Sequence, residues 1–278
     1  MTRMGRIGLT AMRGGAGRGA VWCLVVVALA GCAAGSRPAV TQAPPPERMI
    51  RVGTSPDAPP VSFMREGRIV GVEPDLGQAI VDQIRRPIAL VPMRFDELVP
   101  ALLNGSIDAI MSGMSITPAR RVRLAFSEPY MRSGLLAASS RTDLSKYATR
   151  DAILNAGANV GVRMGSTAES WAQSNLRYGR VVPYPTIDDA ARELSQGRLD
   201  LIISDAPQTA WAVSEFGATL QVIPIRLTEE EIAWAFRPED VELRQGANTA
   251  LATMRRDGRL RALLQRWIPF LDKLEHAR

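Results

Sequence analysis

Beyond residue 48, short apolar runs of strand length alternate with longer segments whose apolar residues recur at helical spacing. Residues 75–85 show the second pattern most clearly, because their apolar side chains fall on one side of a helix that begins beside Pro74. The predicted strands are 49–54, 88–92, 109–112, 160–162, 181–184, 201–204 and 232–236. The predicted helices are 75–85, 97–104, 166–175, 186–196, 207–216 and 241–264, the last with a break at Gly258.

Capping residues support several of these helices. Asp96 is a predicted N-cap for the helix that follows it, and Thr117 with Pro118 in the first helical position predicts another helix start. Thr186 and Asp189 have the spacing of a capping box. These signals make the ends of the apolar strands the places where loops and helix N-termini gather.

Two such strand–helix runs flank an irregular stretch at residues 140–158. Alternation of this kind is typical of parallel sheets covered by helices, so we expect an α/β protein with two lobes.

The N-terminus has the organisation of an export signal. Residues 1–20 contain four arginines and no acid, and an apolar run of about ten residues leads to Gly31 and Cys32. Leu29 to Cys32 resembles a bacterial lipoprotein signal, so we expect residues 1–31 to be removed and Cys32 to carry lipid. The alternative is an ordinary secretion signal with a chance cysteine. Residues 32–48, rich in small residues and proline, are interpreted as a tether.

Charge changes the functional expectations once this segment is set aside. The whole chain carries a formal +6, but residues 32–278 carry 30 basic and 28 acidic side chains, a formal +2. A nearly balanced chain is not typical of a nucleic-acid-binding protein. The only histidine is His276, and the only cysteines are Cys23 and Cys32, which excludes Ser-His-Asp and Cys-His catalysis and a Cys/His zinc site. We expect no metal and no cofactor.

Candidate ligand-binding residues lie at three strand ends. Ser115 and Arg120 can hold a carboxylate, although a capped helix whose arginine pairs with a surface acid fits the same residues. Ser166 and Thr167 open a helix, which is either an anion site or a plain N-cap. Asp205 can receive an ammonium group or cap the helix after it. Together, the three segments form a complementary cradle for a zwitterion.

An ordered series of longer motifs resembles bacterial extracellular solute-binding proteins of family 3, the amino-acid receptors of ABC importers. The matching strings are RVGT (51–54), GVEPDL (71–76), FDELVPAL (95–102), GSID (105–108), SGMSITPAR (112–120), FSEPY (126–130), VGVRMGST (160–167) and LDLIISDAP (199–207). The resemblance implies a type II periplasmic binding protein fold, in which two mostly parallel α/β lobes are joined by two hinge strands. It implies lobe 1 at residues 49–138 and 231–278, and lobe 2 at 139–230.

The resemblance also implies roles for individual residues. Ser115 and Arg120 would bind the ligand α-carboxylate with help from the backbone of Gly113, and Asp205 would bind the α-ammonium. Ser166 and Thr167 would add donors from lobe 2. The side-chain pocket would be formed by Phe95, which offers an apolar face, and by Arg163, which points at the ligand side chain.

Two positions depart from the family pattern. Amino-acid-binding members usually have an acid after the first strand and an aromatic residue three positions on, where this chain has Ser55 and Ala58. Asp57 partly replaces the acid. The loss of the ring and the presence of Arg163 argue against a standard cationic amino acid and favour an anionic or amide-bearing side chain.

We therefore expect a monomeric, lipid-anchored receptor outside the cytoplasm that passes a small amino-acid-like ligand to an ABC transporter permease, with no catalytic residues. One alternative is a cyclohexadienyl dehydratase-like enzyme that uses Glu128 or Asp205 as its acid. Another is a sensor or partner-docking lipoprotein with a degenerate cleft.

Overall fold

The computed structural model describes residues 49–271. The expected signal peptide, the tether and Cys32 lie outside the described residues. Between residues 49 and 271, none of the helices is long and apolar enough to cross a membrane.

The first sheet combines parallel and antiparallel pairing. β1 lies between β5 and β6 and pairs in parallel with both, whereas β14 pairs antiparallel with β6, β7 and β8. Its strands are β5 (Ile88–Pro92), β1 (Ile50–Thr54), β6 (Ala109–Ser115), β14 (Glu230–Phe236), β7 (Ala125–Phe126) and β8 (Met131–Ser133).

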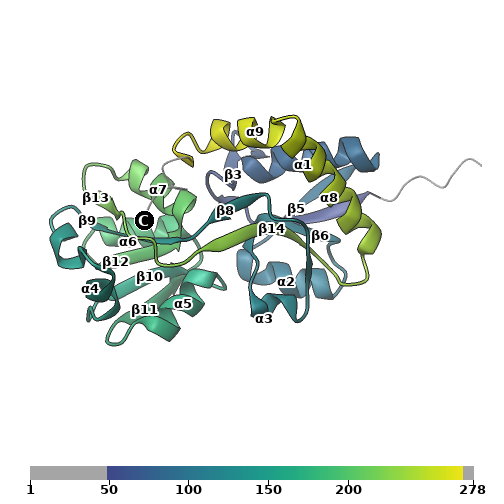
Figure 1. Cartoon of the computed structure of the whole chain (residues 1–278). Helices are drawn as coiled ribbons and strands as arrows, with labels where there is room; N and C mark the ends of the chain where they lie inside the picture. The colour runs from purple at the N-terminus through teal and green to yellow at the C-terminus, as the bar shows by residue number, and fades with distance from the viewer. Residues whose placement is uncertain (1–48, 272–278) are drawn as a thin grey trace, which may run out of the picture. The chain divides into compact units, whose positions relative to one another are not determined.

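Helices cover both faces of this sheet (Figure 1). One face packs against three helices through an apolar cluster that includes Leu76, Trp234 and Leu251. The other face packs against the helix that carries Leu98 and Leu102. The first group is α1 (Val72–Ile84), α8 (Val241–Arg256) and α9 (Arg259–Trp267), and the second is α2 (Phe95–Leu103) with the single turn α3 (Pro118–Arg121).

Between β1 and α1 in the sequence, the chain forms a small antiparallel sheet. Phe63 on its middle strand contacts Trp267 of α9 edge-on at 5.8 Å and Trp211 of α7 at 5.4 Å between ring centroids. The strands are β2 (Asp57–Ala58), β3 (Ser62–Arg65) and β4 (Arg68–Val70).

The second sheet repeats the design of the first. β10 pairs in parallel with β11 and β12, and β9 pairs antiparallel with β12 and β13. Two apolar clusters lie on its opposite faces, one against α4 and α5, the other against α6 and α7. The elements are β9 (Leu135–Ser140), the 3₁₀ turn η1 (Leu144–Tyr147), α4 (Arg150–Leu154), β10 (Asn159–Arg163), α5 (Thr167–Asn175), β11 (Arg180–Tyr184), α6 (Ile187–Ser195), β12 (Leu201–Asp205), α7 (Ala206–Glu215) and β13 (Leu220–Ile223).

The chain passes between the sheets at two places. β8 leads through Gly134 into β9, and the segment after β13 returns to β14, so β8 and β14 run side by side where they leave the first sheet (Figure 1). We call residues 49–133 and 230–271 lobe 1, and residues 134–229 lobe 2. The expected division at residue 138 falls inside β9, whose whole length pairs within the second sheet.

Several local expectations differ from the structure. α1 begins at Val72 rather than at residue 75, and α2 begins at Phe95, with Arg94 rather than Asp96 at the N-cap. The Arg94 backbone N–H donates to the Glu97 carboxylate, as in a capping box. The helix therefore starts at Phe95, two residues before the predicted start at residue 97. The stretch at 140–158 contains α4, and the sheets are mixed because the strands nearest the two crossings pair antiparallel.

A buried carboxylate fastens the middle of lobe 1. Glu73 accepts hydrogen bonds from the Gly113 N–H at 2.7 Å, the Tyr130 hydroxyl at 2.7 Å and the Trp234 Nε1–H at 2.5 Å. Burial raises the pKa of Glu73 to about 7, and the three donors oppose that rise. The carboxylate therefore ties α1 to the end of β6 and to the crossing strand β14.

Replacement of Glu73 by alanine should leave three buried donors without an acceptor. We expect Glu73→Ala to lower the free energy of unfolding by about 2–5 kcal/mol. Chemical denaturation measures the difference. Glu215→Ala, at an exposed position in the last turn of α7, is the control and should change the free energy by less than about 0.5 kcal/mol. Equal stability of the two variants would contradict this role of Glu73.

Candidate functional site

The polar residues expected at three strand ends meet where the two lobes face each other. β6 ends at Ser115 in lobe 1, while β10 ends at Arg163 and β12 at Asp205 in lobe 2. Carboxyl ends of parallel strands are the usual ligand-binding edge of an open α/β sheet. Here the edges of both sheets contribute to one region.

A small cavity lies between the lobes at this edge. Its volume is about 10 Å³, enough for about one water molecule. Gly113, at φ 66°, is part of its wall, and a Cβ there would lie 3.0 Å from Cγ1 of Val61. The Gly113 N–H points to Glu73 rather than into the cavity. The lining residues are Val61, Gly113, Met131, Ser133, Asp205, Pro207, Gln208 and Ile232.

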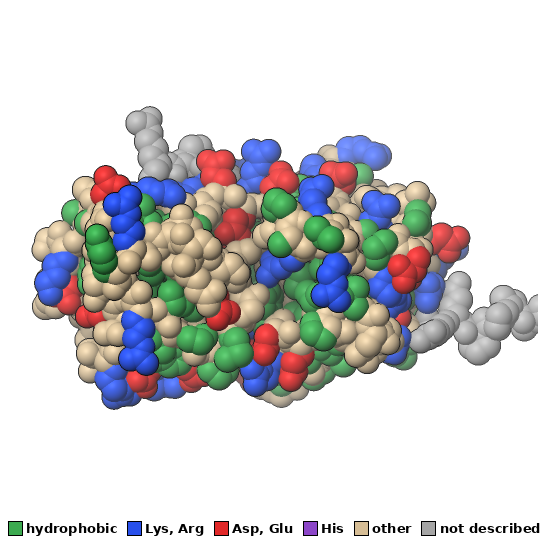
Figure 2. Space-filling model, turned by 90° about the horizontal axis from the view of Figure 1, so that it is seen from below, with side chains coloured by type: hydrophobic (Ala, Val, Ile, Leu, Met, Phe, Trp, Pro, Cys, Tyr) green, Lys and Arg blue, Asp and Glu red, His purple; other side chains and the backbone are tan. Residues whose placement is uncertain are grey.

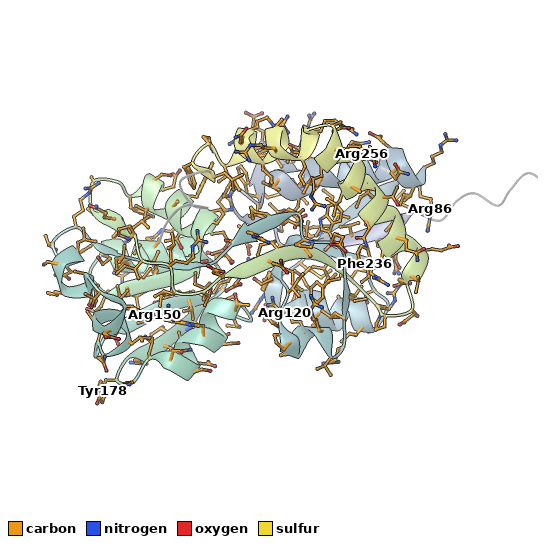
Figure 3. All side chains as sticks on the ribbon, viewed as in Figure 1. Arg86, Arg120, Arg150, Tyr178, Phe236 and Arg256 are labelled. Carbon is orange, nitrogen blue, oxygen red and sulfur yellow. The ribbon has the colours of Figure 1, made fainter. Side chains whose placement is uncertain are left out.

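Arg120 lies at the boundary between the lobes, as the labelled side chain in Figure 3 shows. α3 starts as predicted, with the Thr117 hydroxyl accepting a hydrogen bond from the Arg120 N–H at 3.1 Å. The Arg120 guanidinium donates to the Ser115 carbonyl at 2.9 Å and, across the boundary, to the Gly165 carbonyl at 3.3 Å. Burial lowers the pKa of Arg120, and the carboxylates of Asp205 and Glu230 counteract that shift. The charged guanidinium therefore donates its hydrogen bonds to two neutral backbone carbonyls.

Asp205 occupies the N-cap position of α7, but its side chain accepts no capping hydrogen bond. Its Oδ1 is buried and has no hydrogen-bond partner within residues 49–271. Burial, followed by the charge of Glu230, raises the pKa of Asp205 to about 7, and Arg120 and Arg163 oppose the rise. Of the two sequence interpretations, capping is not what this carboxyl does.

The hydroxyls expected from lobe 2 already have protein partners. Ser166 caps α5, accepting from the Glu169 N–H at 3.2 Å, and donates to the Arg163 carbonyl at 2.6 Å. Thr167 donates to a carboxylate oxygen of Glu230 at 3.0 Å. Sequence reasoning missed Glu230. The available signal was an acid two residues before the strand predicted at 232–236, where the chain returns to lobe 1.

Arg163 crosses from lobe 2 into lobe 1 and is enclosed there. Its NH2 donates to Ser55 Oγ at 2.5 Å and forms an ion pair with Asp57. The guanidinium carbon lies 4.4 Å from the centre of the Phe95 ring. The Arg163 side chain is 3% exposed, against 27% for that of Asp57. Phe95, expected to offer its face to a ligand, is therefore covered by Arg163.

The lobes approach closely at Gly165. This residue has φ 73°, and a Cβ built on it would lie 3.0 Å from Cβ of Asp96 in α2. The Arg94 guanidinium also contacts Met164 Sδ at 3.3 Å. A glycine is thus required here both by its backbone conformation and by the contact across the lobe boundary.

Other candidate chemistry lies elsewhere or is absent from the described residues. Glu128 is exposed and lines a separate surface hollow with Arg121 and Arg244, away from Asp205. Residues 49–271 contain no cluster of three side chains arranged to hold a metal ion. In Figure 2, basic and acidic side chains are interspersed over the face shown.

The family model for bacterial extracellular solute-binding proteins, family 3, matches residues 50–270. This chain belongs to that family. The match covers both lobes, and type II periplasmic binding proteins are its structural neighbours, so the expected fold class is confirmed.

Individual relatives of this family 3 protein are moderately similar. The histidine-binding periplasmic protein of Escherichia coli K12 is 30% identical over 236 residues, which cover 80% of this chain and 88% of the relative. The ABC transporter arginine-binding protein 1 of the same organism is 28% identical over 225 residues, 79% of this chain and 90% of that protein. The solved structure of the ancestral amino acid-binding protein AncCDT-1, a precursor of cyclohexadienyl dehydratase, has a TM-score of 0.74 at 30% identity. It covers 79% of this chain and 95% of its own. The family assignment gives this chain an extracytoplasmic solute-binding role, and these relatives agree with it.

The raised pKa of Asp205 gives the ligand-free protein a defined pH dependence. Folding favours the protonated carboxyl, so this contribution to stability is complete below pH 4 and is lost as the pH rises through about 7. We expect Asp205→Asn to be more stable than the unsubstituted protein at pH 8, by roughly 1–3 kcal/mol, with the difference shrinking towards pH 5. Denaturation curves at both pH values test this. A constant difference would show that the Asp205 carboxyl does not titrate in this range.

Proposed function

We propose that this family 3 protein is a lipid-anchored extracytoplasmic receptor that captures an amino-acid-like zwitterion between its lobes and delivers it to an ABC importer. The observation that carries the proposal is the placement of opposite charges on opposite lobes. Arg120 of lobe 1 and Asp205 of lobe 2 are close enough for each charge to shift the pKa of the other. Only contact between the lobes brings both to one ligand.

Each group has unused capacity for such a ligand. Asp205 Oδ1 is a buried acceptor without a partner in the described part of the chain, which an α-ammonium would satisfy. The Arg120 guanidinium has five N–H donors, and two hydrogen bonds from it go to the carbonyls of Ser115 and Gly165. An α-carboxylate would replace weak carbonyl contacts with a charge-assisted pair.

The hydrogen bonds that the remaining residues make in this structure limit the roles that we propose for them. Ser115 would supply its hydroxyl to the carboxylate, and Gly113 would shape the wall of the cavity while its N–H stays on Glu73. Ser166 and Thr167 would need to exchange protein partners for ligand, since both hydroxyls are engaged. A cavity of about 10 Å³ cannot hold an amino acid, so entry requires the lobes to separate.

Ligand-driven closure needs contacts that exist only in the closed arrangement. Arg120 and Asp205 provide that differential for a zwitterion. The histidine- and arginine-binding relatives support an amino acid as the ligand class and an ABC transporter permease as the partner.

One observation favours a second function. Asp205 and Glu230 form a pair of neighbouring carboxyls, one of them with a pKa near 7, which suits a general acid. AncCDT-1 is itself described as an amino acid-binding protein, but its description as a precursor of cyclohexadienyl dehydratase keeps this second function open. Loss of water and carbon dioxide from prephenate or arogenate, catalysed by the purified protein, would favour this enzyme over the receptor.

The receptor predicts that Arg120→Ala loses amino-acid binding but keeps its fold. A thermal-shift screen of the chain beginning at Ala33, against the common amino acids, dicarboxylates and small amines, would measure this. A ligand at 100 times its Kd adds about 2.7 kcal/mol, or roughly 5–11 °C for a protein of this size. We expect affinity to fall at least 30-fold, roughly, in Arg120→Ala.

The neighbouring Arg121 supplies the matched control, because it is exposed on the same turn of α3. Arg121→Ala should bind as the unsubstituted chain does. Unchanged affinity in Arg120→Ala would refute the carboxylate role. A screen without any shift would favour the dehydratase or a docking protein with a degenerate cleft.

The lipid anchor has its own test, independent of the cleft. Expressed at full length in a diderm bacterium fed labelled palmitate, the protein should take up label and partition with membranes. Cys32→Ser should abolish both, while Cys23→Ser, which removes the only other cysteine, should leave both intact. Label retained in Cys32→Ser would contradict the anchor.

A further inference from the structure

The region beside Phe95 is already occupied by a cation that belongs to the protein. The guanidinium of Arg163 stacks on the Phe95 ring, pairs with the Asp57 carboxylate and donates to Ser55. All three partners are in lobe 1, whereas Arg163 comes from the end of β10 in lobe 2. A carboxylate, a hydroxyl and an aromatic face are together what a protein uses to hold a guanidinium or ammonium group.

This arrangement excludes a ligand cation from the same place. A lysine- or arginine-like side chain would have to displace Arg163 from Asp57 and Phe95. When the lobes close, the Arg163 guanidinium becomes almost fully enclosed, so a ligand cation on Asp57 and Phe95 would leave it buried without its carboxylate partner.

Arg163 still has one donor without a hydrogen-bond partner among the described residues. Its Nε is buried and has no hydrogen-bond partner between residues 49 and 271. Asp205 Oδ1 is likewise a buried acceptor, with no partner in the described part of the chain. Arg163 ends β10 and Asp205 ends β12, and these strands pair in parallel, so the two open positions lie at the same edge of the second sheet. A ligand that satisfies both must present an ammonium to Asp205 and an oxygen acceptor to Arg163.

We infer that Arg163 determines specificity, by excluding cationic side chains and selecting amino acids whose side chain ends in a carboxylate or carboxamide oxygen. The inference rests on the proposed receptor function, because it assumes that Arg120 and Asp205 bind the ligand backbone. It adds the class of side chain, which those two residues leave open.

The first experiment is an affinity panel on the unsubstituted chain beginning at Ala33, measured by titration calorimetry. The ligands are aspartate, glutamate, asparagine, glutamine, arginine and lysine. We expect at least one of the first four to bind, and arginine and lysine to bind at least 100-fold more weakly, roughly, than the best of them. The acid and amide arms decide which oxygen acceptor is preferred.

The second experiment empties the place that Arg163 fills. In Arg163→Leu, the Asp57 carboxylate and the Phe95 face become available, so arginine should gain affinity while the oxygen-bearing ligand loses it. The ratio of the two affinities should shift by about 100-fold or more. Arg180→Leu, an exposed arginine on the neighbouring strand β11, should leave the ratio unchanged. Adding Asp57→Asn to Arg163→Leu should abolish the gained arginine binding.

The outcomes distinguish a failure of the proposed specificity from a failure of the proposed receptor function. Tight binding of arginine or lysine to the unsubstituted chain would overturn the inference and leave the receptor intact. An Arg163→Leu protein that folds by circular dichroism but keeps the original ratio would also overturn it. If no amino acid binds the unsubstituted chain, the receptor fails and the inference with it. Should Arg163→Leu not fold, the panel on the unsubstituted chain still decides.

Discussion

The contact between the lobes depends on one buried guanidinium. Arg163 gives up nearly all of its hydration, which costs several kcal/mol for a charged group. Its partners offset that cost in three ways: a carboxylate from Asp57, a hydroxyl from Ser55 and the face of the Phe95 ring. None of these partners shares a lobe with Arg163, so its burial exists only while the lobes are together. The weaker contacts at the boundary, such as Arg120 with the Gly165 carbonyl, form under the same condition.

Within lobe 1, the Glu73 carboxylate plays a comparable part over a shorter range. Its three donors come from the end of β6, from the segment before β8 and from β14. It therefore connects the loop beside the cavity to the strand that crosses between lobes. Both arrangements place ionisable groups in poorly hydrated surroundings, which is expensive unless the surrounding structure holds their partners in position.

The fold could largely be predicted from the sequence, because apolar periodicity and capping residues are local signals. The strand at Ile88–Pro92, the caps at Thr117, Ser166 and Thr186, and the break at Gly258 follow from neighbours a few residues apart. That reasoning missed β9, because this strand pairs antiparallel with β12 and β13 far along the chain.

The candidate site was predictable in composition but not in pairing. Asp205 and Arg120 could be selected by residue type and by position at or just after strand ends, and Arg163 through the family resemblance. That Glu230 would approach Asp205 and engage Thr167, and that Arg163 would cover Phe95, depends on how two lobes meet. No spacing within one lobe contains that information.

The contact between the tilted rings of Phe63 and Trp211 has a practical consequence. Trp211 belongs to α7 of lobe 2, and the ring it contacts, 5.4 Å away, belongs to the hairpin of lobe 1. Trp234, in contrast, is fully buried in a cluster formed by residues of lobe 1 alone. Separation of the lobes therefore changes the surroundings of the Trp211 indole, so the fluorescence of Trp211 is a built-in signal of opening.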